Sequence, residues 1–373
     1  MSHNKKLKVG ITHGDINGIS YEVILKALSA EGITELFTPV IFGSSKLLGY
    51  YRKALDMEEF PCNIIQNAAD ARDEEVNLVN ISQDEFKVEL STPTAESGKA
   101  ALMALEAACE ALKEGDIDLL VTAPINKEAM KMAGFPHMGH TEYLEEKLGN
   151  GEKAMMIFAD ENMRLALCTI HLPLKDVAPA ITQEKVSESI RLLHESLRKD
   201  FGRERPLIAV LSLNPHVGDG GVIGTEESEA IAPAIEDAIA HKIMAFGPFA
   251  ADGFFGSGEW KKYDGVLAMY HDQGLAPFKL LSGTSGVNFT AGLPYVRTSP
   301  DHGTGYDIAG KSLADPTSLR NAIYTGIDIY RRRRDYLRAK AHPLRKQLQD
   351  KGGDRVKLDL TKDPTPADEP LGI

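Results

Sequence analysis

The sequence predicts an α/β fold in which helices cover both faces of a largely parallel sheet. Aliphatic runs that read as buried strands, such as Lys8–Thr12, Thr38–Phe42 and Asp118–Thr122, alternate with segments like Ser97–Leu112, whose apolar residues recur at helical spacing. This alternation is typical of parallel sheets with crossover helices. At 373 residues the chain is too long for one ordinary core, so we expect two domains.

The remaining elements follow from the same patterns. Further helices are expected at Tyr21–Leu28, Ser45–Leu55, Gln183–Leu197, Glu226–Ala240 and from Asp315 to about Ala339, where Asp315 and Pro316 form a helix start. Further strands are expected at 63–65, 78–81, 165–170, 207–213, 265–270 and 287–290. We expect loops at 247–253 and 297–306. Residues 353–373 are polar and contain prolines, which predicts a poorly ordered tail.

The composition excludes several classes of protein. The formal net charge of -12 argues against nucleic acid or an anionic membrane as a partner, because both attract basic surfaces. The N-terminus has no apolar signal region, and no stretch approaches the ~18 apolar residues of a membrane span. The cysteines, Cys62, Cys109 and Cys168, are scattered and have no metal-finger spacing. We therefore expect reduced thiols and a cytoplasmic location.

Three predicted strands, 165–170, 207–213 and 265–270, lead into a histidine: His171, His216 and His271, respectively. Ligands in α/β folds bind at the carboxyl ends of strands, and neutral imidazole is a common ligand of Zn and similar ions. The three histidines therefore indicate one divalent-metal site with positions left open for substrate oxygens. The alternative is that each histidine only caps its own strand through a backbone hydrogen bond.

A second group of polar residues lies in predicted loops or at element ends: His140, Thr141, Lys279, Asn288 and Arg297. A phosphate or carboxylate group is bound by charge-assisted donors, which Lys and Arg supply together with a hydroxyl at a helix start. Taken singly, each of these residues reads as an ordinary surface residue.

Four carboxylates lie in Gly-rich segments: Asp15, Asp252, Asp272 and Asp301. Such groups orient ligating histidines or transfer protons. An Asp in a turn is also common for local reasons, because it bonds to the nearby backbone. Both interpretations stay open for Asp272, which adjoins His271, and the local one is the simpler interpretation of the other three.

The segment Gly305–Ser312 matches the phosphate-loop pattern GxxxxGK[ST] letter for letter. That motif requires a buried strand before the loop and a helix directly after the lysine, here Lys311. We expect neither, because 297–302 does not read as a strand and Pro316 delays the helix. A P-loop NTPase or kinase is therefore the less favoured alternative, although the loop can contact a nucleotide in another way. No G-x-G-x-x-G fingerprint follows a strand.

Together these motifs resemble those of the 4-hydroxythreonine-4-phosphate dehydrogenase family of vitamin B6 biosynthesis. The matching segments lie in the family's order between residue 10 and about residue 310: Gly14-Asp15, Thr122–Lys127, Gly139-His140-Thr141-Glu142, His171-Leu172-Pro173-Leu174, Leu213-Asn214-Pro215-His216, Gly247-Pro248, Ala251-Asp252, Tyr270-His271-Asp272-Gln273-Gly274 and Asp301-His302-Gly303-Thr304.

The resemblance implies a role for each residue group. His171, His216 and His271 would be metal ligands (Zn, Mg or Co), with Asp252 and Asp272 also catalytic, and the group around Arg297 would hold the phosphorylated substrate. It also implies a fold like that of isocitrate and isopropylmalate dehydrogenases, with a cleft between two three-layer αβα domains. We place these domains at 1–140 plus 285–340 and at 141–284. A homodimer with its active site at the subunit interface is implied as well.

The implied reaction is NAD- or NADP-dependent oxidation of 4-phosphooxy-L-threonine at C3, followed by decarboxylation to 3-amino-2-oxopropyl phosphate. The chain departs from the family in its first loop, Thr12–Gly18, where His13 and Ile16 stand in place of prolines, and at Asn126, where the family has a histidine. Threonate or erythronate 4-phosphate is the alternative substrate, and the choice between NAD and NADP stays open.

Overall fold

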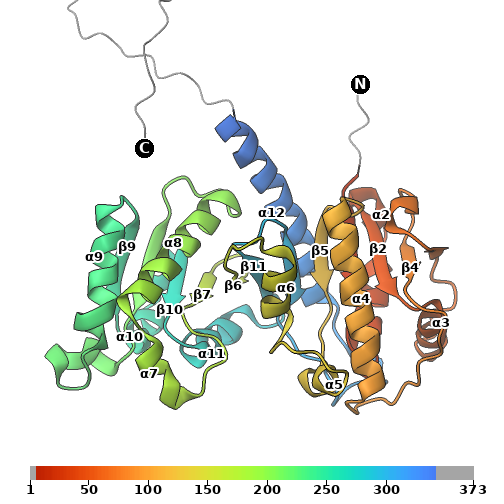
Figure 1. Ribbon diagram of the computed structural model, residues 1–373, viewed down its shortest axis with the longest axis horizontal. Coiled ribbons are helices and arrows are strands. Elements are labelled where there is room, and N and C mark those ends of the chain that lie inside the picture. Colours follow the sequence, from red (N-terminus) through yellow and green to blue (C-terminus); the bar gives the residue numbers. More distant parts are fainter. Residues whose placement is uncertain (1–5, 342–373) are drawn as a thin grey trace, which may run out of the picture.

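The computed structural model describes residues 6–341, whose strands form one twisted sheet of twelve in the order β3-β4-β2-β1-β5-β12-β11-β6-β7-β10-β8-β9 (Figure 1). The strands are β1 (Lys8–Thr12), β2 (Thr38–Gly43), β3 (Asn63–Ile65), β4 (Asn77–Asn80), β5 (Leu119–Thr122), β6 (Met155–Ala159), β7 (Arg164–Leu167), β8 (Leu207–Leu211), β9 (Met244–Phe249), β10 (Gly265–Ala268), β11 (Val287–Ala291) and β12 (Arg297–Pro300).

The sheet contains two parallel blocks. Strands β3, β4, β2, β1, β5 and β12 are parallel, and so are β7, β10, β8 and β9. Between the blocks, β11 pairs antiparallel with both β12 and β6, and β6 pairs antiparallel with β7. The expectation of an α/β fold with a largely parallel sheet is confirmed.

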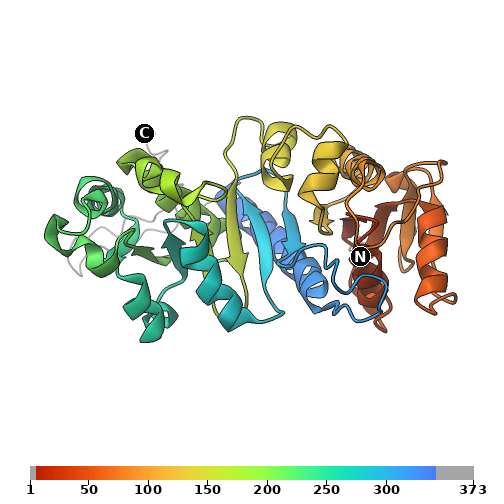
Figure 2. The same ribbon diagram turned by 90° about the horizontal axis from the view of Figure 1, so that it is seen from below.

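The longer helices are α1 (Ser20–Leu28), α3 (Ser45–Ala54), α4 (Ala95–Glu114), α6 (His140–Leu148), α8 (Gln183–Lys199), α9 (Ala232–Ala240), α11 (His271–Ser282) and α12 (Thr317–Ala341). Shorter helical segments are α2 (Ile33–Leu36), α5 (Lys127–Met132), α7 (Val177–Ala180) and α10 (Ala251–Gly256), and the turns η1 (Ala68–Asp70), η2 (Leu174–Asp176), η3 (Pro215–Gly221), η4 (Glu227–Ile231) and η5 (Glu259–Lys262). Figure 2 shows helices on both sides of the twisted sheet.

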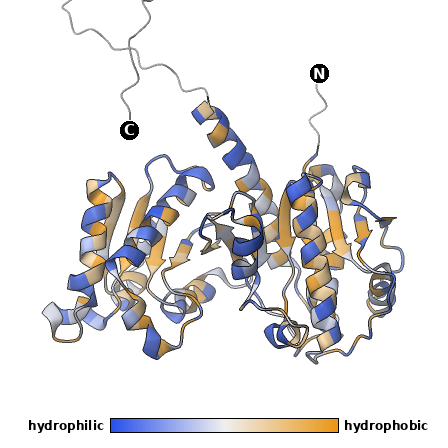
Figure 3. Cartoon of the chain, viewed as in Figure 1, coloured by the Kyte–Doolittle hydropathy of each residue, from blue (hydrophilic) through white to orange (hydrophobic). Residues whose placement is uncertain are grey.

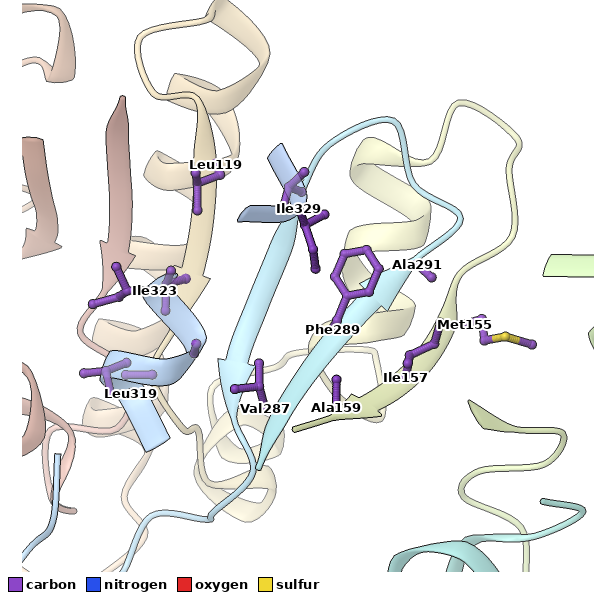
Figure 4. Close-up of a cluster of buried hydrophobic side chains, with 14 of the residues drawn as sticks. Leu119, Met155, Ile157, Ala159, Val287, Phe289, Ala291, Leu319, Ile323 and Ile329 are labelled. Atoms are coloured by element: carbon purple, nitrogen blue, oxygen red, sulfur yellow. The ribbon is translucent and has the colours of Figure 1, made fainter. Parts of the chain in front are cut away.

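Apolar side chains fill the space between the sheet and each helical layer, while the outer helix surfaces are polar (Figure 3). On one face a single continuous cluster runs along the whole sheet. Its central part joins Leu119 of β5, Ile157 of β6, Phe289 of β11 and Ile323 of α12 (Figure 4). Hydrophobic burial on this face therefore joins the two parallel blocks.

The opposite face carries two separate apolar clusters. One packs α4 and α6 on the first block, with Leu120 of β5 at its edge, and the other packs α10 and α11 on the second block, with Phe158 of β6 at its edge. The strands β12 and β11 lie between these edges. This separation is consistent with the proposed division into 1–140 plus 285–340 and 141–284, which remains a proposal.

Two of the expected loops are wrong. Arg297–Pro300 is the fully buried strand β12, because it pairs on both sides, with β5 and β11. In the other segment, residues up to Phe249 complete β9 beside β8, and α10 begins at Ala251. Both loops were predicted from their Gly and Pro residues, but pairing with neighbouring strands determines the conformation of Arg297–Pro300 and of the residues up to Phe249. The predicted tail at 353–373 lies outside the described residues.

Two expectations from the composition concern the state of the cysteines and the absence of membrane-spanning segments. The three cysteines are free, and two of them, Cys109 and Cys168, are buried. Within residues 6–341, the helices are too short or too polar to cross a bilayer.

Candidate active site

The three predicted metal ligands follow neighbouring strands. In the sheet, β10 lies between β7 and β8, and all three strands are parallel, so their carboxyl ends lie at one edge. His171 follows β7, His216 follows β8, and His271 begins α11 directly after β10. The sequence interpretation of three histidines at equivalent strand ends therefore agrees with the topology.

The structure brings two of these histidines together. The ring centroids of His171 and His271 are 6.4 Å apart. Nδ1 of His171 lies 3.4 Å from Oε1 of Glu142, and Nδ1 of His271 lies 2.7 Å from Oδ1 of Asp272. A carboxylate on Nδ1 is the usual arrangement around a histidine whose Nε2 binds a metal. Here Nε2 of His171 also lies 3.4 Å from Lys127 Nζ. The hydrogen bond with His171 lowers the pKa of Glu142.

His216 does not join this pair in the described part of the chain. It is exposed and begins a run in which every residue from His216 to Gly221 has positive φ, including His216 at 51° and Val217 at 58°. A β-branched residue in this conformation is strained. Within residues 6–341 of one chain, the structure contains no group of three or more ligating side chains close enough to hold a metal. The donor chemistry thus fits a metal, and the single subunit supplies a pair.

Arg297 occupies the centre of the second predicted group. Its side chain is 2% exposed, and its guanidinium donates hydrogen bonds to the hydroxyl oxygens of Thr122 and Thr290. It forms no ion pair with any carboxylate of the described chain. Burial lowers the pKa of Arg297 to about 9. A buried cation held only by hydroxyl groups is costly unless an anion joins it.

Several polar atoms around Arg297 also have no hydrogen-bond partner among residues 6–341. They are His140 Nε2, Asn288 Oδ1 and Glu142 Oε2, all of them buried. Burial lowers the pKa of His140 well below its ordinary value, and the nearby Arg297 charge lowers it further. Buried polar groups are normally paired, so a cluster of unpaired ones points to a missing ligand.

Strand register explains why these side chains meet. Thr290 lies opposite Arg297, and Asn288 lies opposite Ser299, so all four side chains point to one face of β11 and β12. That face lies between the two separate apolar clusters, next to α6, whose first residues are His140 and the buried Thr141. The predicted group of His140, Thr141, Asn288 and Arg297 thus lies between the two blocks.

Lys279, the fifth member of the group, lies on the exposed side of α11. Its Nζ donates to the carbonyl oxygen of Asp301 at 3.1 Å and lies 3.6 Å from Oδ1 of the same residue. Burial raises the pKa of Asp301, and the charges of Lys279 and His271 oppose that rise. Asp301 therefore contacts Lys279 through both its carbonyl oxygen and its carboxylate.

A cavity of about 460 Å³ adjoins Lys279. Its lining includes Ile19, Asp301, His302, Gly303, Gly305 and Ile308. Residues 305–308 of this wall are part of Gly305–Ser312, the segment that matches the phosphate-loop pattern. It is lined by one of the predicted substrate residues, Lys279, and has both apolar and polar walls, as small-molecule sites do.

The phosphate-loop match lacks the required geometry. A strand, β12, does precede it, which corrects one half of the argument against it, but α12 begins only at Thr317. Lys311 Nζ donates to the carbonyl oxygen of Asp307, one turn back in the same loop. The Lys311 ammonium group therefore makes its hydrogen bond within its own loop.

Some residues differ from their predicted placement. Asp252 is exposed on α10, and no hydrogen bond or ion pair joins it to a predicted ligand in the described part of the chain. Sequence reasoning did not select Glu142 or Lys127 as functional, and it favoured a purely local role for Asp301. Lys127 Nζ lies 3.4 Å from His171 Nε2. The sequence did contain one indication of a functional role for Lys127 and Glu142. Each lies in the first turn of a helix that follows a candidate loop.

Comparisons with known proteins agree with the family that the motifs indicate. The model of the family described as pyridoxal phosphate biosynthetic protein PdxA matches residues 35–326. The 4-hydroxythreonine-4-phosphate dehydrogenase of Bacteroides thetaiotaomicron is 53% identical over 355 residues, which cover 95% of this chain and 97% of that protein.

Solved structures agree as well. The 4-hydroxythreonine-4-phosphate dehydrogenase of Klebsiella pneumoniae superposes with a TM-score of 0.74 and 32% identity, covering 88% of this chain and 99% of that one. The enzyme of the same name from Burkholderia phymatum gives a TM-score of 0.71 and 33% identity, covering 87% and 99%. This chain belongs to the 4-hydroxythreonine-4-phosphate dehydrogenase (PdxA) family, a family of oxidoreductases in pyridoxal phosphate biosynthesis.

Proposed function

We propose that this protein oxidises the C3 hydroxyl of 4-phosphooxy-L-threonine with NAD or NADP, and that the resulting β-keto acid loses carbon dioxide to give 3-amino-2-oxopropyl phosphate. The single observation that carries the proposal is the buried guanidinium of Arg297, which donates to hydroxyl groups and forms no ion pair with a carboxylate of residues 6–341. A dianionic phosphate supplies the missing charge.

In this assignment Arg297 and His140 bind the phosphate, with Thr141 and Asn288 beside them and Lys279 on the opposite wall. Anchoring the phosphate spends binding energy on orienting the distant hydroxyl, because the reacting carbon is then fixed relative to the histidines. Burial and the Arg297 charge lower the pKa of His140, which favours the neutral ring, and a neutral ring donates one hydrogen bond.

His171, His216 and His271 would hold a divalent metal. When bound, such an ion lowers the pKa of the hydroxyl and stabilises the negative charge left by decarboxylation. Glu142 and Asp272 keep the two paired imidazoles oriented, and Lys127 places a positive charge beside His171. Asp252 stays a candidate proton-transfer group by resemblance alone.

The cavity beside Lys279 is our candidate for the nicotinamide cofactor. It is lined by Lys279, which we assign to the substrate, so a cofactor bound there would lie beside the substrate. Its glycines, Gly303 and Gly305, let a ligand approach the backbone closely.

A homodimer with shared sites is supported by exposed apolar side chains beside the histidines. Leu174, three residues after His171, is 74% exposed, and Val222, which follows the left-handed run at His216, is 83% exposed. Exposed apolar groups that border a polar site are typical of protein interfaces. A second subunit would also supply what a three-ligand metal site lacks in one chain.

The test is formation of NADH or NADPH with 4-phosphooxy-L-threonine, with metal present, chelated and restored as Zn, Mg or Co. Metal-dependent reduction is expected. The competing substrates are threonate and erythronate 4-phosphate, and the highest kcat/KM identifies the substrate. Absence of reduction with all three, in the presence of each metal, would reject the assignment.

A further inference from the structure

The loop that follows β1 joins two walls of the candidate site. We propose that Asp15 is a positioning residue: through the Tyr306 hydroxyl it fixes the loop that forms the cofactor wall relative to the loop that carries Lys127. The proposal rests on the proposed function, because it assumes that the cavity beside Lys279 takes the nicotinamide cofactor.

The Asp15 side chain is bonded to the loop that forms the cavity wall. Its side chain is 1% exposed, and Tyr306 Oη donates to its Oδ2 at 2.6 Å. Two residue pairs reinforce this contact: Ile19 N donates to Thr304 O at 2.9 Å, and a Cβ on Gly18 would come within 2.4 Å of the same oxygen. Only glycine at position 18 allows the loops to approach this closely.

The Asp15 backbone is bonded to the loop that precedes Lys127, the lysine that contacts His171. Its backbone N–H donates to Pro124 O at 2.8 Å, and the Ser20 hydroxyl donates to the same carbonyl at 3.3 Å. Pro124 lies three residues before Lys127, which contacts His171. Asp15 therefore bonds both to the loop that forms the cavity wall and to the loop that precedes Lys127.

These anchors matter because the cavity wall has little structure of its own. Residues 301–316 contain neither a strand nor a helix, and Gly305, Gly310 and Ser312 have positive φ. A wall held in its binding conformation removes an ordering cost from cofactor binding. Loss of the Tyr306 bond returns that cost, so cofactor affinity should fall while phosphate binding at Arg297 stays unchanged.

The experiment compares Tyr306→Phe with Tyr330→Phe in the full-length protein. Tyr330 Oη donates to Asp118 Oδ1 at 2.9 Å, so the control breaks the same kind of bond away from the cavity. The readouts are the Kd for NADH by fluorescence titration, separate KM values for cofactor and phosphorylated substrate, and the melting temperature. Tyr306→Phe should raise the Kd for NADH roughly tenfold, as expected for loss of one charge-assisted hydrogen bond.

The control should lose thermal stability without a change in the Kd for NADH. Asp15→Asn keeps an acceptor oxygen and should raise the Kd less than Tyr306→Phe does. Ser91→Ala, an exposed site whose hydroxyl donates to Tyr306 O, should raise it slightly and provides a variant that folds. Equal Kd values in wild type, Tyr306→Phe and Ser91→Ala would overturn the positioning role. Absence of NADH binding by the wild type would instead reject the proposed function, and this inference with it.

Discussion

The Nε atom of Arg297 lies 3.1 Å from the hydroxyl oxygen of Thr122, on the neighbouring strand, in a buried setting where no carboxylate among residues 6–341 lies within ion-pair distance. Arg333 provides a contrast. It is also buried, but its Nε donates to Asp200 at 2.8 Å and its Nη1 donates to Leu293 O at 3.0 Å. The Asp200 carboxylate balances the charge of Arg333, whereas Arg297 forms no such ion pair among residues 6–341.

Replacing these two arginines should give opposite results. Arg297→Met should leave the free energy of unfolding unchanged or higher, because it removes an unpaired buried charge, and should abolish turnover of the phosphorylated substrate. Arg333→Met should cost about 3–5 kcal/mol, because it strands the buried Asp200 carboxylate. Chemical denaturation and steady-state kinetics measure both effects. Substantial destabilisation by Arg297→Met would show that its charge is already compensated in the free protein.

Inorganic phosphate should stabilise the wild-type protein through the same site. Its melting temperature should rise with phosphate concentration, since a ligand that binds only the folded state adds to stability. The Arg297→Met variant should show no such rise at equal ionic strength, with chloride as the control anion. A rise of equal size in both proteins would place the phosphate elsewhere.

Metal removal should stop turnover without unfolding the chain. His171→Ala and His271→Ala should each abolish metal-dependent activity, while His241→Ala, an exposed residue that ends α9, should retain it. If His171 and His271 of one subunit share a metal with His216 of the other, mixing the His171→Ala and His216→Ala proteins should restore part of the activity, because one of the two sites in a mixed dimer is then intact. The absence of any recovery in demonstrated mixed dimers would count against a shared site.

Lys311→Ala should leave dehydrogenase turnover within a few-fold of wild type, because the lysine bonds only to Asp307 O within its own loop. ATP hydrolysis should be undetectable before and after the change. Hydrolysis that disappears in Lys311→Ala would revive the P-loop interpretation.

His13 should make the protein sensitive to acid. Its ring is fully buried and stacks on Tyr21 at a centroid distance of 5.3 Å, and burial lowers its pKa from 6.5 to about 4. The unfolded chain therefore binds the proton more readily, so stability falls as the pH drops from 6.5 towards 4. His13→Phe should reduce that loss by roughly 3 kcal/mol at most. Denaturation at several pH values measures it, with His241→Gln as the control.

Local pattern was enough to predict much of this protein. Short aliphatic runs fixed the buried strands, including the three neighbours β7, β10 and β8, because a buried parallel strand needs an unbroken apolar sequence. The residues after those strands identified His171, His216 and His271 as candidates. The order of motifs along the chain identified the family, which the comparisons confirm.

Only the tertiary structure decided how these residues combine. Arg297 looked like a loop residue because Pro300 and the following glycine segment resemble a turn, whereas pairing with β5 and β11 buries it in a strand. The unpaired Nε2 of His140 and the contact of Lys127 with His171 join segments far apart in sequence. Such long-range pairing is set by packing, which leaves no periodic signature in the chain.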